Sequence, residues 1–231
     1  MDIHKEIAEF DELSKTIAAS NLSLTEELRA IQELSDKMAP PQILQSVDEI
    51  KAAFESENVI KVGTTIPEFK LSDATGNIVS SSELVAKGPV LIIFYRGGWC
   101  PYCNLALAAY QKHLDEFKEK GVTVIGISPQ LPDTSLTVAE KNALKFTVLS
   151  DVGNELGRKL GLVWTMPEYL RPFLKQFGAD IEGGNGDDTF EVPVPANILV
   201  DGKGVVQNVY TNPDYRKRLD PAVALEWADA L

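Results

Sequence analysis

The sequence predicts an α/β protein with a central mixed sheet flanked by helices and an N-terminal helical extension. Two apolar runs, residues 90–95 and 122–128, are typical of strands buried on both faces. Between them, apolar residues recur at helical spacing. Because a helix joining two such strands implies a parallel pair and a right-handed crossover, these runs form the centre of the predicted sheet. Turn signals on either side predict further, antiparallel strands.

Residues 1–58 form the predicted extension, and residues 59–231 the predicted main domain. Apolar spacing predicts a first helix over residues 3–17, and a capping box of Ser23 and Glu26 starts a second. A third, shorter helix follows. These helices carry most of the net charge of −12. Their apolar faces must pack either on the main domain or on a second copy of the chain, as in a homodimer.

The main domain alternates strands and helices along its length. The expected elements are, in order, a hairpin of strands 66–71 and 78–81, a helix from Ser81, strand 90–95, helix 105–117, strand 122–128, helix 134–144, strand 146–149, helix 154–160, a helix from Pro167 bent at Pro172, a Gly-rich acidic loop over 178–195, a hairpin over 197–210 and a closing helix over 222–231. We interpret the acidic loop as a mobile polar lid.

Composition excludes several classes of partner. A net charge of −12 disfavours nucleic acid and anionic membranes, and the basic triplet at residues 216–218 is interpreted as a solvated helix approach. No run is long enough to span a bilayer and no export signal is visible, so we expect a cytoplasmic protein. The chain has 2 cysteines and 2 histidines, the latter far apart, so no metal site is expected.

Cys100 and Cys103 are the only cysteines, and they stand between a predicted buried strand and a predicted helix. A thiol at a helix N-terminus is stabilised as a thiolate by the free backbone amides and the helix dipole. The second thiol lies one turn further, within reach of a disulfide. We therefore predict a redox couple of Cys100 and Cys103.

Motifs around this pair resemble those of the thioredoxin superfamily. The sequence WCPYC is similar to its active-site motifs, and Pro195, before a predicted strand, resembles its cis-proline, so Val194–Pro195 is the candidate cis bond. The ordered segments KVGTTIPEFKLSDATGN, VLIIFYRGGWCPYCN, VIGISPQ, VLSD and ILVDGKG resemble the alkyl hydroperoxide reductase and thiol-specific antioxidant branch, the peroxiredoxin-like proteins. The resemblance covers residues 59–231 and is strongest to a subgroup with a CxxC and a helical extension.

The chain also departs from the peroxiredoxin pattern. In the motif PxxxTxxC, Arg96 replaces the proline, Cys100 replaces the threonine and Cys103 takes the peroxidatic position. The arginine expected before the last two strands is replaced by Pro195, and thioredoxin's buried acid by Phe94. On a thioredoxin-like fold the first cysteine of a CxxC faces solvent and the second is shielded by the helix turn, so the resemblance implies an exposed Cys100 as the attacking sulfur. The match of Cys103 to the peroxidatic position leaves the reverse order open, with Cys103 attacking and Cys100 resolving.

Other candidate site residues flank the pair. Arg96 is expected to stabilise a thiolate or to be a surface cation, and Trp99 to gate access or to fill the core. Tyr102 is expected to shape a substrate groove or to lie on the surface. Gln130, after a parallel strand, could reach the site from the same sheet edge. The backbone at Val194 and Pro195 would pair with a substrate chain.

The resemblance implies a thioredoxin-like fold and an antioxidant thiol peroxidase that reduces hydroperoxides through a Cys100–Cys103 disulfide. Thioredoxin, glutaredoxin or a small thiol would regenerate the dithiol, without a metal, flavin or nicotinamide. Two alternatives stay open: a protein disulfide reductase of the thioredoxin type, and a redox sensor whose helices change partner on oxidation.

Overall fold

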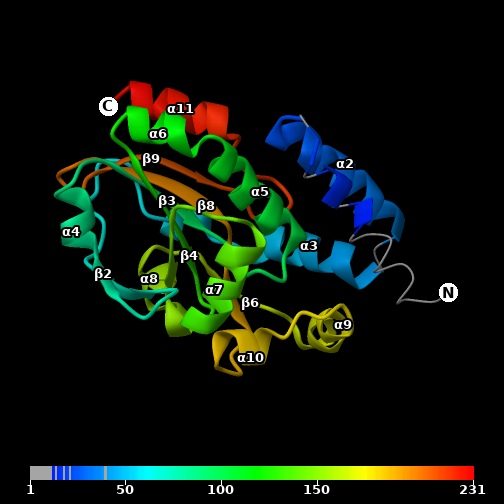
Figure 1. The fold of residues 1–231 in the computed structure, drawn as a ribbon. Coiled ribbons are helices and arrows are strands. Elements are labelled where there is room, and N and C mark those ends of the chain that lie inside the picture. Colours follow the sequence, from blue (N-terminus) through cyan, green and yellow to red (C-terminus); the bar gives the residue numbers. More distant parts are fainter. Residues whose placement is uncertain (1–11, 14, 18, 21, 39–40) are drawn as a thin grey trace.

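A seven-stranded mixed sheet forms the centre of the computed structural model, which describes residues 12, 13, 15–17, 19, 20, 22–38 and 41–231 (Figure 1). Its strands lie in the order β2, β1, β5, β4, β3, β8, β9. They comprise β1 (Lys70–Asp73), β2 (Ile78–Ser80), β3 (Val90–Phe94), β4 (Thr123–Ser128), β5 (Thr147–Ser150), β8 (Ala196–Val200) and β9 (Val206–Thr211). Strands β3, β4 and β5 are parallel and the other pairs antiparallel, which confirms the predicted mixed sheet.

Helices cover both faces of this sheet. The helices of the described residues are α2 (Leu24–Met38), α3 (Pro41–Ala53), α4 (Ser81–Val85), α5 (Pro101–Lys112), α6 (Leu114–Glu119), α7 (Pro132–Lys141), α8 (Glu155–Lys159), α9 (Arg171–Gln176), α10 (Ile181–Asn185) and α11 (Pro221–Asp229), of which α9 and α10 pack near the small sheet described below. Short 3₁₀ turns occupy Ser56–Asn58, Val152–Asn154 and Glu168–Leu170. Side chains of β3 alternate between the two cores: Leu91 and Ile93 contact the α5 side, while Ile92 and Phe94 face the opposite core.

The N-terminal helix α2 packs against α5 of the main domain (Figure 1). Its capping box forms as predicted, because the Ser23 amide donates to Glu26 Oε2 at 2.9 Å and the Glu26 amide to Ser23 Oγ at 3.4 Å. Leu28 and Ile31 of its apolar face belong to the same hydrophobic core as the buried residues of α5. The main domain therefore receives this face. The helix predicted over residues 3–17 lies mostly outside the described residues.

Two predicted elements differ from the structure. The helix expected over 105–117 is divided into α5 and α6 at His113, whose backbone leaves the helical region (φ −98°, ψ 6°). The segment 178–195 is not a mobile polar lid: Asp180 caps α10, and Ile181 and Asn185 are buried. The same segment contains β7 (Glu191–Pro193), which pairs with β6 (Val163–Thr165) in a second, two-stranded sheet.

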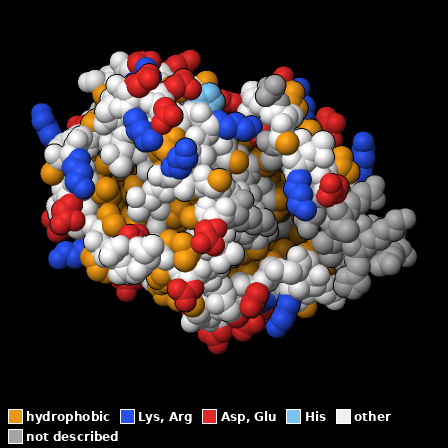
Figure 2. All heavy atoms as spheres, in the orientation of Figure 1, with side chains coloured by type: hydrophobic (Ala, Val, Ile, Leu, Met, Phe, Trp, Pro, Cys, Tyr) orange, Lys and Arg blue, Asp and Glu red, His pale blue; other side chains and the backbone are white. Residues whose placement is uncertain are grey.

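The surface carries charges of both signs. On the face drawn in Figure 2, acidic and basic side chains of the described residues are interspersed rather than gathered into a basic patch. Within the part of the chain that the structure describes, no helix has the length and apolar character that crossing a membrane requires.

Candidate active site

The two cysteines lie where the central strand β3 passes into α5. Strand β3 pairs in parallel with β4 and antiparallel with β8, and all its side chains are buried. The chain then turns, with the Cys100 amide donating to the Gly97 carbonyl at 3.1 Å. Cys100 is the N-cap of α5 and Pro101 its first residue, a position where the missing amide hydrogen costs nothing. This confirms the predicted strand-to-helix placement.

The loop before Cys100 depends on two glycines. Gly97 has φ +142°, and a Cβ there would lie 2.5 Å from the Trp99 indole nitrogen. A Cβ on Gly98 would lie 2.2 Å from Val138 Cγ2 of α7. The side chain of Gln130 accepts a hydrogen bond from the Gly98 amide at 2.7 Å. Gln130 thus reaches the cysteine loop from the end of β4 and fastens its backbone.

Both thiols are buried, with exposed fractions of 1% for Cys100 and 0% for Cys103. The expected contrast between an exposed first and a shielded second cysteine is therefore wrong. Burial, and then the hydrogen bond that its thiol gives to Cys103, raise the pKa of Cys100 well above the ordinary value. Burial would also raise the pKa of Cys103. That hydrogen bond and the charges of Arg218 and Arg96 outweigh burial, so the pKa of Cys103 is lowered.

Arg96 is a buried cation at this site, not a surface one, since 4% of it is exposed. Its guanidinium lies between two aromatic rings, 4.6 Å from the centroid of Trp99 and 3.9 Å from that of Tyr215. Its backbone amide also stabilises the Cys103 thiolate. Among the described residues, no carboxylate forms an ion pair with Arg96. The thiolate therefore receives its charge without competition from an acidic side chain of that part of the chain.

Arg218 is the second cation, and sequence reasoning missed it. Its Nη2 lies 3.4 Å from Cys103 Sγ, although the two residues are 115 positions apart. The interpretation of residues 216–218 as a solvated helix approach is wrong, because Arg216 is buried and Arg218 partly buried. One feature of the sequence indicated that a second cation was needed. The expected family arginine is replaced by Pro195, so a thiolate site here needs a cation from elsewhere.

Tyr102 and Trp99 pack around the pair. Tyr102 is 4% exposed and meets the Tyr215 ring edge to face, with centroids 6.0 Å apart, so it lines no open groove in this state. Trp99 is partly buried and packs against two of the hydrophobic cores. Its indole nitrogen and the Tyr102 hydroxyl have no hydrogen-bond partner among the described residues. Burial, and to a lesser extent the nearby Cys103, raise the pKa of the Tyr95 phenol well above its ordinary value.

Val194 and Pro195 lie just before β8, near the end of β3. Their peptide bond differs from the prediction. No peptide bond is cis among the described residues, so the candidate cis bond at Val194–Pro195 is trans. The Val194 amide donates to the Leu162 carbonyl at 2.6 Å, and the Pro195 carbonyl accepts from Thr211 Oγ1 at 3.1 Å. These local bonds hold the chain extended as it enters β8. They also occupy backbone groups that a substrate chain would need.

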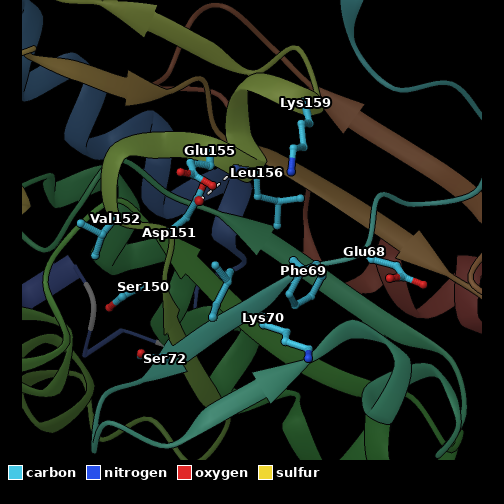
Figure 3. Close-up of a pocket in the computed structure, with 11 residues that line it drawn as sticks. Glu68, Phe69, Lys70, Ser72, Ser150, Asp151, Val152, Glu155, Leu156 and Lys159 are labelled. Atoms are coloured by element: carbon cyan, nitrogen blue, oxygen red, sulfur yellow. Dashed lines mark hydrogen bonds between the residues drawn. The ribbon is translucent and has the colours of Figure 1, made fainter.

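A pocket lies away from the cysteines, between β1, β5 and α8 (Figure 3). It has a volume of about 320 Å³ and none of the residues around the cysteines line it. Its buried acid, Asp151, uses both carboxylate oxygens to accept from the Leu156 and Gly157 amides, at 3.0 and 2.8 Å. Asp151 is thus a structural cap for the turn into α8. The pocket offers no redox group, so the cysteine site is the candidate active centre.

The fold defines a thioredoxin-like α/β protein in which two buried thiols lie at a strand-to-helix turn. Residues 62–209 match the family model described as AhpC/TSA family. The chain belongs to the AhpC/TSA family, which confirms the resemblance seen in the sequence.

Individual relatives agree. The chain is 31% identical over 153 residues to the chloroplastic peroxiredoxin Q of Populus jackii, covering 66% of this chain and 61% of that one. It is 28% identical over 170 residues to peroxiredoxin Bcp of Escherichia coli (strain K12), covering 74% and 96%. The match thus spans about three fifths of the Populus relative's length and nearly all of the bacterial one.

Solved structures show the same fold. Peroxidoxin BcpB from Mycobacterium tuberculosis superposes with a TM-score of 0.59 at 21% identity, covering 74% of this chain and 98% of that one. The reduced 2-Cys peroxiredoxin of Plasmodium vivax gives a TM-score of 0.58 at 22% identity, with coverage of 74% and 81%. In both cases about a quarter of this chain lies outside the shared fold.

Proposed function

We propose that this protein is a thiol peroxidase that reduces hydroperoxides through a dithiol–disulfide cycle of Cys103 and Cys100. One observation carries the proposal: Cys103 has a lowered pKa, two guanidinium groups act on it, and the neighbouring thiol donates a hydrogen bond to it. A thiolate is the nucleophile in such chemistry, and the low dielectric of a buried site strengthens each of these interactions.

In this cycle the Cys103 thiolate attacks one oxygen of the peroxide. The O–O bond breaks, Cys103 becomes a sulfenic acid, and the departing alkoxide takes a proton to leave as an alcohol. The Cys100 thiol then displaces the hydroxyl of the sulfenic acid, which leaves as water, and the disulfide forms. Overall, the dithiol in its thiolate form, one peroxide and one proton give a disulfide, an alcohol and water.

This order reverses the one predicted from the sequence. The preference for Cys100 rested on its exposure, and both sulfurs are buried. Arg218 contacts Cys103, and the pKa of Cys100 is raised, so Cys100 stays protonated and serves as the resolving thiol.

The disulfide must be reduced by two electrons from outside the chain. We propose thioredoxin, glutaredoxin or a small thiol as the donor and the reducing environment of the cytoplasm as the setting, with an antioxidant role. A protein disulfide reductase is less well supported, because the Pro195 carbonyl and the Val194 amide already have partners and β8 is paired on both sides. No observation favours a pure redox sensor.

The test mixes reduced protein with hydrogen peroxide and counts thiols. We expect two thiols per chain to disappear in one phase that is much faster than oxidation of a free thiol. A rate equal to that of a free thiol would refute the peroxidase. Separately, Cys100→Ser should accumulate a sulfenic acid trapped by dimedone, whereas Cys103→Ser should not. The opposite pattern would restore Cys100 as the attacking sulfur.

A further inference from the structure

We infer that the N-terminal extension belongs to the active site, with Arg216 as the positioning residue that connects them. Arg216 holds the segment 214–218 on α2 and α3, and this segment carries two groups of the cysteine site. The inference rests on the proposed function, because it concerns how Cys103 is activated.

The anchoring bonds of Arg216 leave it little freedom. Its Nε and Nη2 donate to the two carboxylate oxygens of Asp214 at 2.8 and 3.0 Å, and its Nη1 donates to Asp36 of α2 at 2.9 Å. Lys51 of α3 lies 3.5 Å from Asp214. Arg216 and Asp214 are buried, with 8% and 3% exposed. A bidentate, buried pair of this kind fixes geometry as well as charge.

The residues near Arg216 in the chain, Tyr215 and Arg218, contact the cysteine site. The ring of Tyr215 lies under the Arg96 guanidinium at 3.9 Å from centroid to Cζ, and its edge contact with Tyr102 spans 6.0 Å. Arg218 reaches Cys103 Sγ at 3.4 Å. A shift of Arg216 would therefore move both an aromatic wall of the Arg96 site and the second cation.

This segment has no helix or strand to hold it. Residues 212–220 form bends and a turn between β9 and α11. The backbone is tied locally by the Lys217 amide, which donates to the Asp214 carbonyl at 2.9 Å. Side-chain anchors to α2 and α3 consequently determine where Tyr215 and Arg218 lie. Both these helices and residues 214–218 lie outside the family match at 62–209.

The experiment uses the full chain and reads the Cys103 thiolate directly, by its ultraviolet absorbance against pH. Asp36→Ala and Arg216→Lys should raise the pKa of Cys103 and slow peroxide reduction several-fold at acidic pH, without loss of far-ultraviolet circular dichroism. Asp36→Glu should restore both. The matched control is Asp115→Ala, which breaks an exposed pair with Lys118 on α6 and should titrate like the wild type.

The outcomes separate this inference from the proposed function. If Asp36→Ala and Arg216→Lys titrate like the wild type while Arg218→Gln does not, the extension has no part in activation and the inference is wrong. If the wild type fails to reduce peroxide, the proposed function is wrong, but the thiolate titration still tests the anchoring. A variant that has lost its circular dichroism is replaced by Asp36→Asn, which keeps the side-chain volume and removes the charge, and the same two results decide.

Discussion

Replacing Arg218 with glutamine tests directly whether its charge activates Cys103. The change keeps a long polar side chain and removes the positive charge beside the sulfur. Because a cation next to a thiol favours the thiolate, we expect the pKa of Cys103 to rise and the pH at which peroxide reduction becomes half-maximal to rise with it. At high pH, where the thiol ionises without help, most of the deficit caused by the lost ionisation should disappear.

The magnitude follows from the contact distance. At 3.4 Å, two unit charges interact by about 5 kcal/mol at an effective dielectric constant of about 20, which is an upper bound. Arg218 is partly exposed, so water screens part of this energy, and Arg96 still acts on the sulfur. We expect about 2 kcal/mol to be lost, which corresponds to an increase of about 1–2 in the pKa.

The assay is the second-order rate of reaction with hydrogen peroxide, measured by stopped flow across the pH range, together with the thiolate titration. Lys217→Gln is the matched control, because it removes the same charge from an exposed neighbour and should leave the inflection unchanged. An Arg218→Gln profile that overlays the wild type would show that the contact with Cys103 has no electrostatic effect, and the reasoning would fail.

Three further predictions concern Gly98 in the loop before Cys100, the loss of stability at acidic pH through Asp214, and the resolving thiol of Cys100. Gly98→Ala should destabilise the protein by about 1–3 kcal/mol in urea titration, because the new methyl meets Val138, and adding Val138→Ala should recover part of the loss; strict additivity would contradict the clash. Burial opposes ionisation of Asp214, but its bonds to arginine outweigh burial and lower its pKa, so this pair stabilises the fold above the carboxyl's ordinary pKa of 3.8 and ceases to do so as the pH falls below it. Asp214→Asn should therefore lower the free energy of unfolding by about 3 kcal/mol at neutral pH. On acidification, the variant should lose less further stability than the wild type does, as urea titrations at several pH values will show. Cys100→Ala should raise the pKa of Cys103 by about 1, since one hydrogen bond to the thiolate is lost, and the pH dependence of alkylation would measure it; an unchanged profile would rule out that bond.

Much of the fold could be predicted because its signals are local. Continuous apolar runs predict β3 and β4, and the Ser23–Glu26 capping box predicts the start of α2. The short sheet of β6 and β7 was not predicted, because strands of three residues are too short to show any periodicity. Helix α10 was not predicted, because a Gly-rich acidic segment resembles a loop. The cap from Asp180 and the burial of Ile181 are nevertheless sufficient to form a helical turn.

The sequence could predict the position of the two cysteines and the approach of Gln130, but not the burial of both thiols or the contact with Arg218. The sequence shows two closely spaced cysteines at a predicted strand-to-helix turn, and it also shows Arg96 near them. Burial of Cys100 and the approach of Arg218 depend on how segments remote along the chain pack over that turn. The attacking sulfur that we propose follows from those contacts, which a pattern of spacing alone does not contain.

The two guanidinium groups around Cys103 also have a consequence for the oxidised protein. When the disulfide forms, the thiolate's negative charge disappears and Arg96 and Arg218 no longer have an anion at the sulfur. Because those cations stabilise the reduced, ionised form selectively, they raise the reduction potential of the couple. In the proposed cycle, the low pKa that favours attack on peroxide therefore also makes the disulfide a stronger oxidant, which an external thiol reduces more readily.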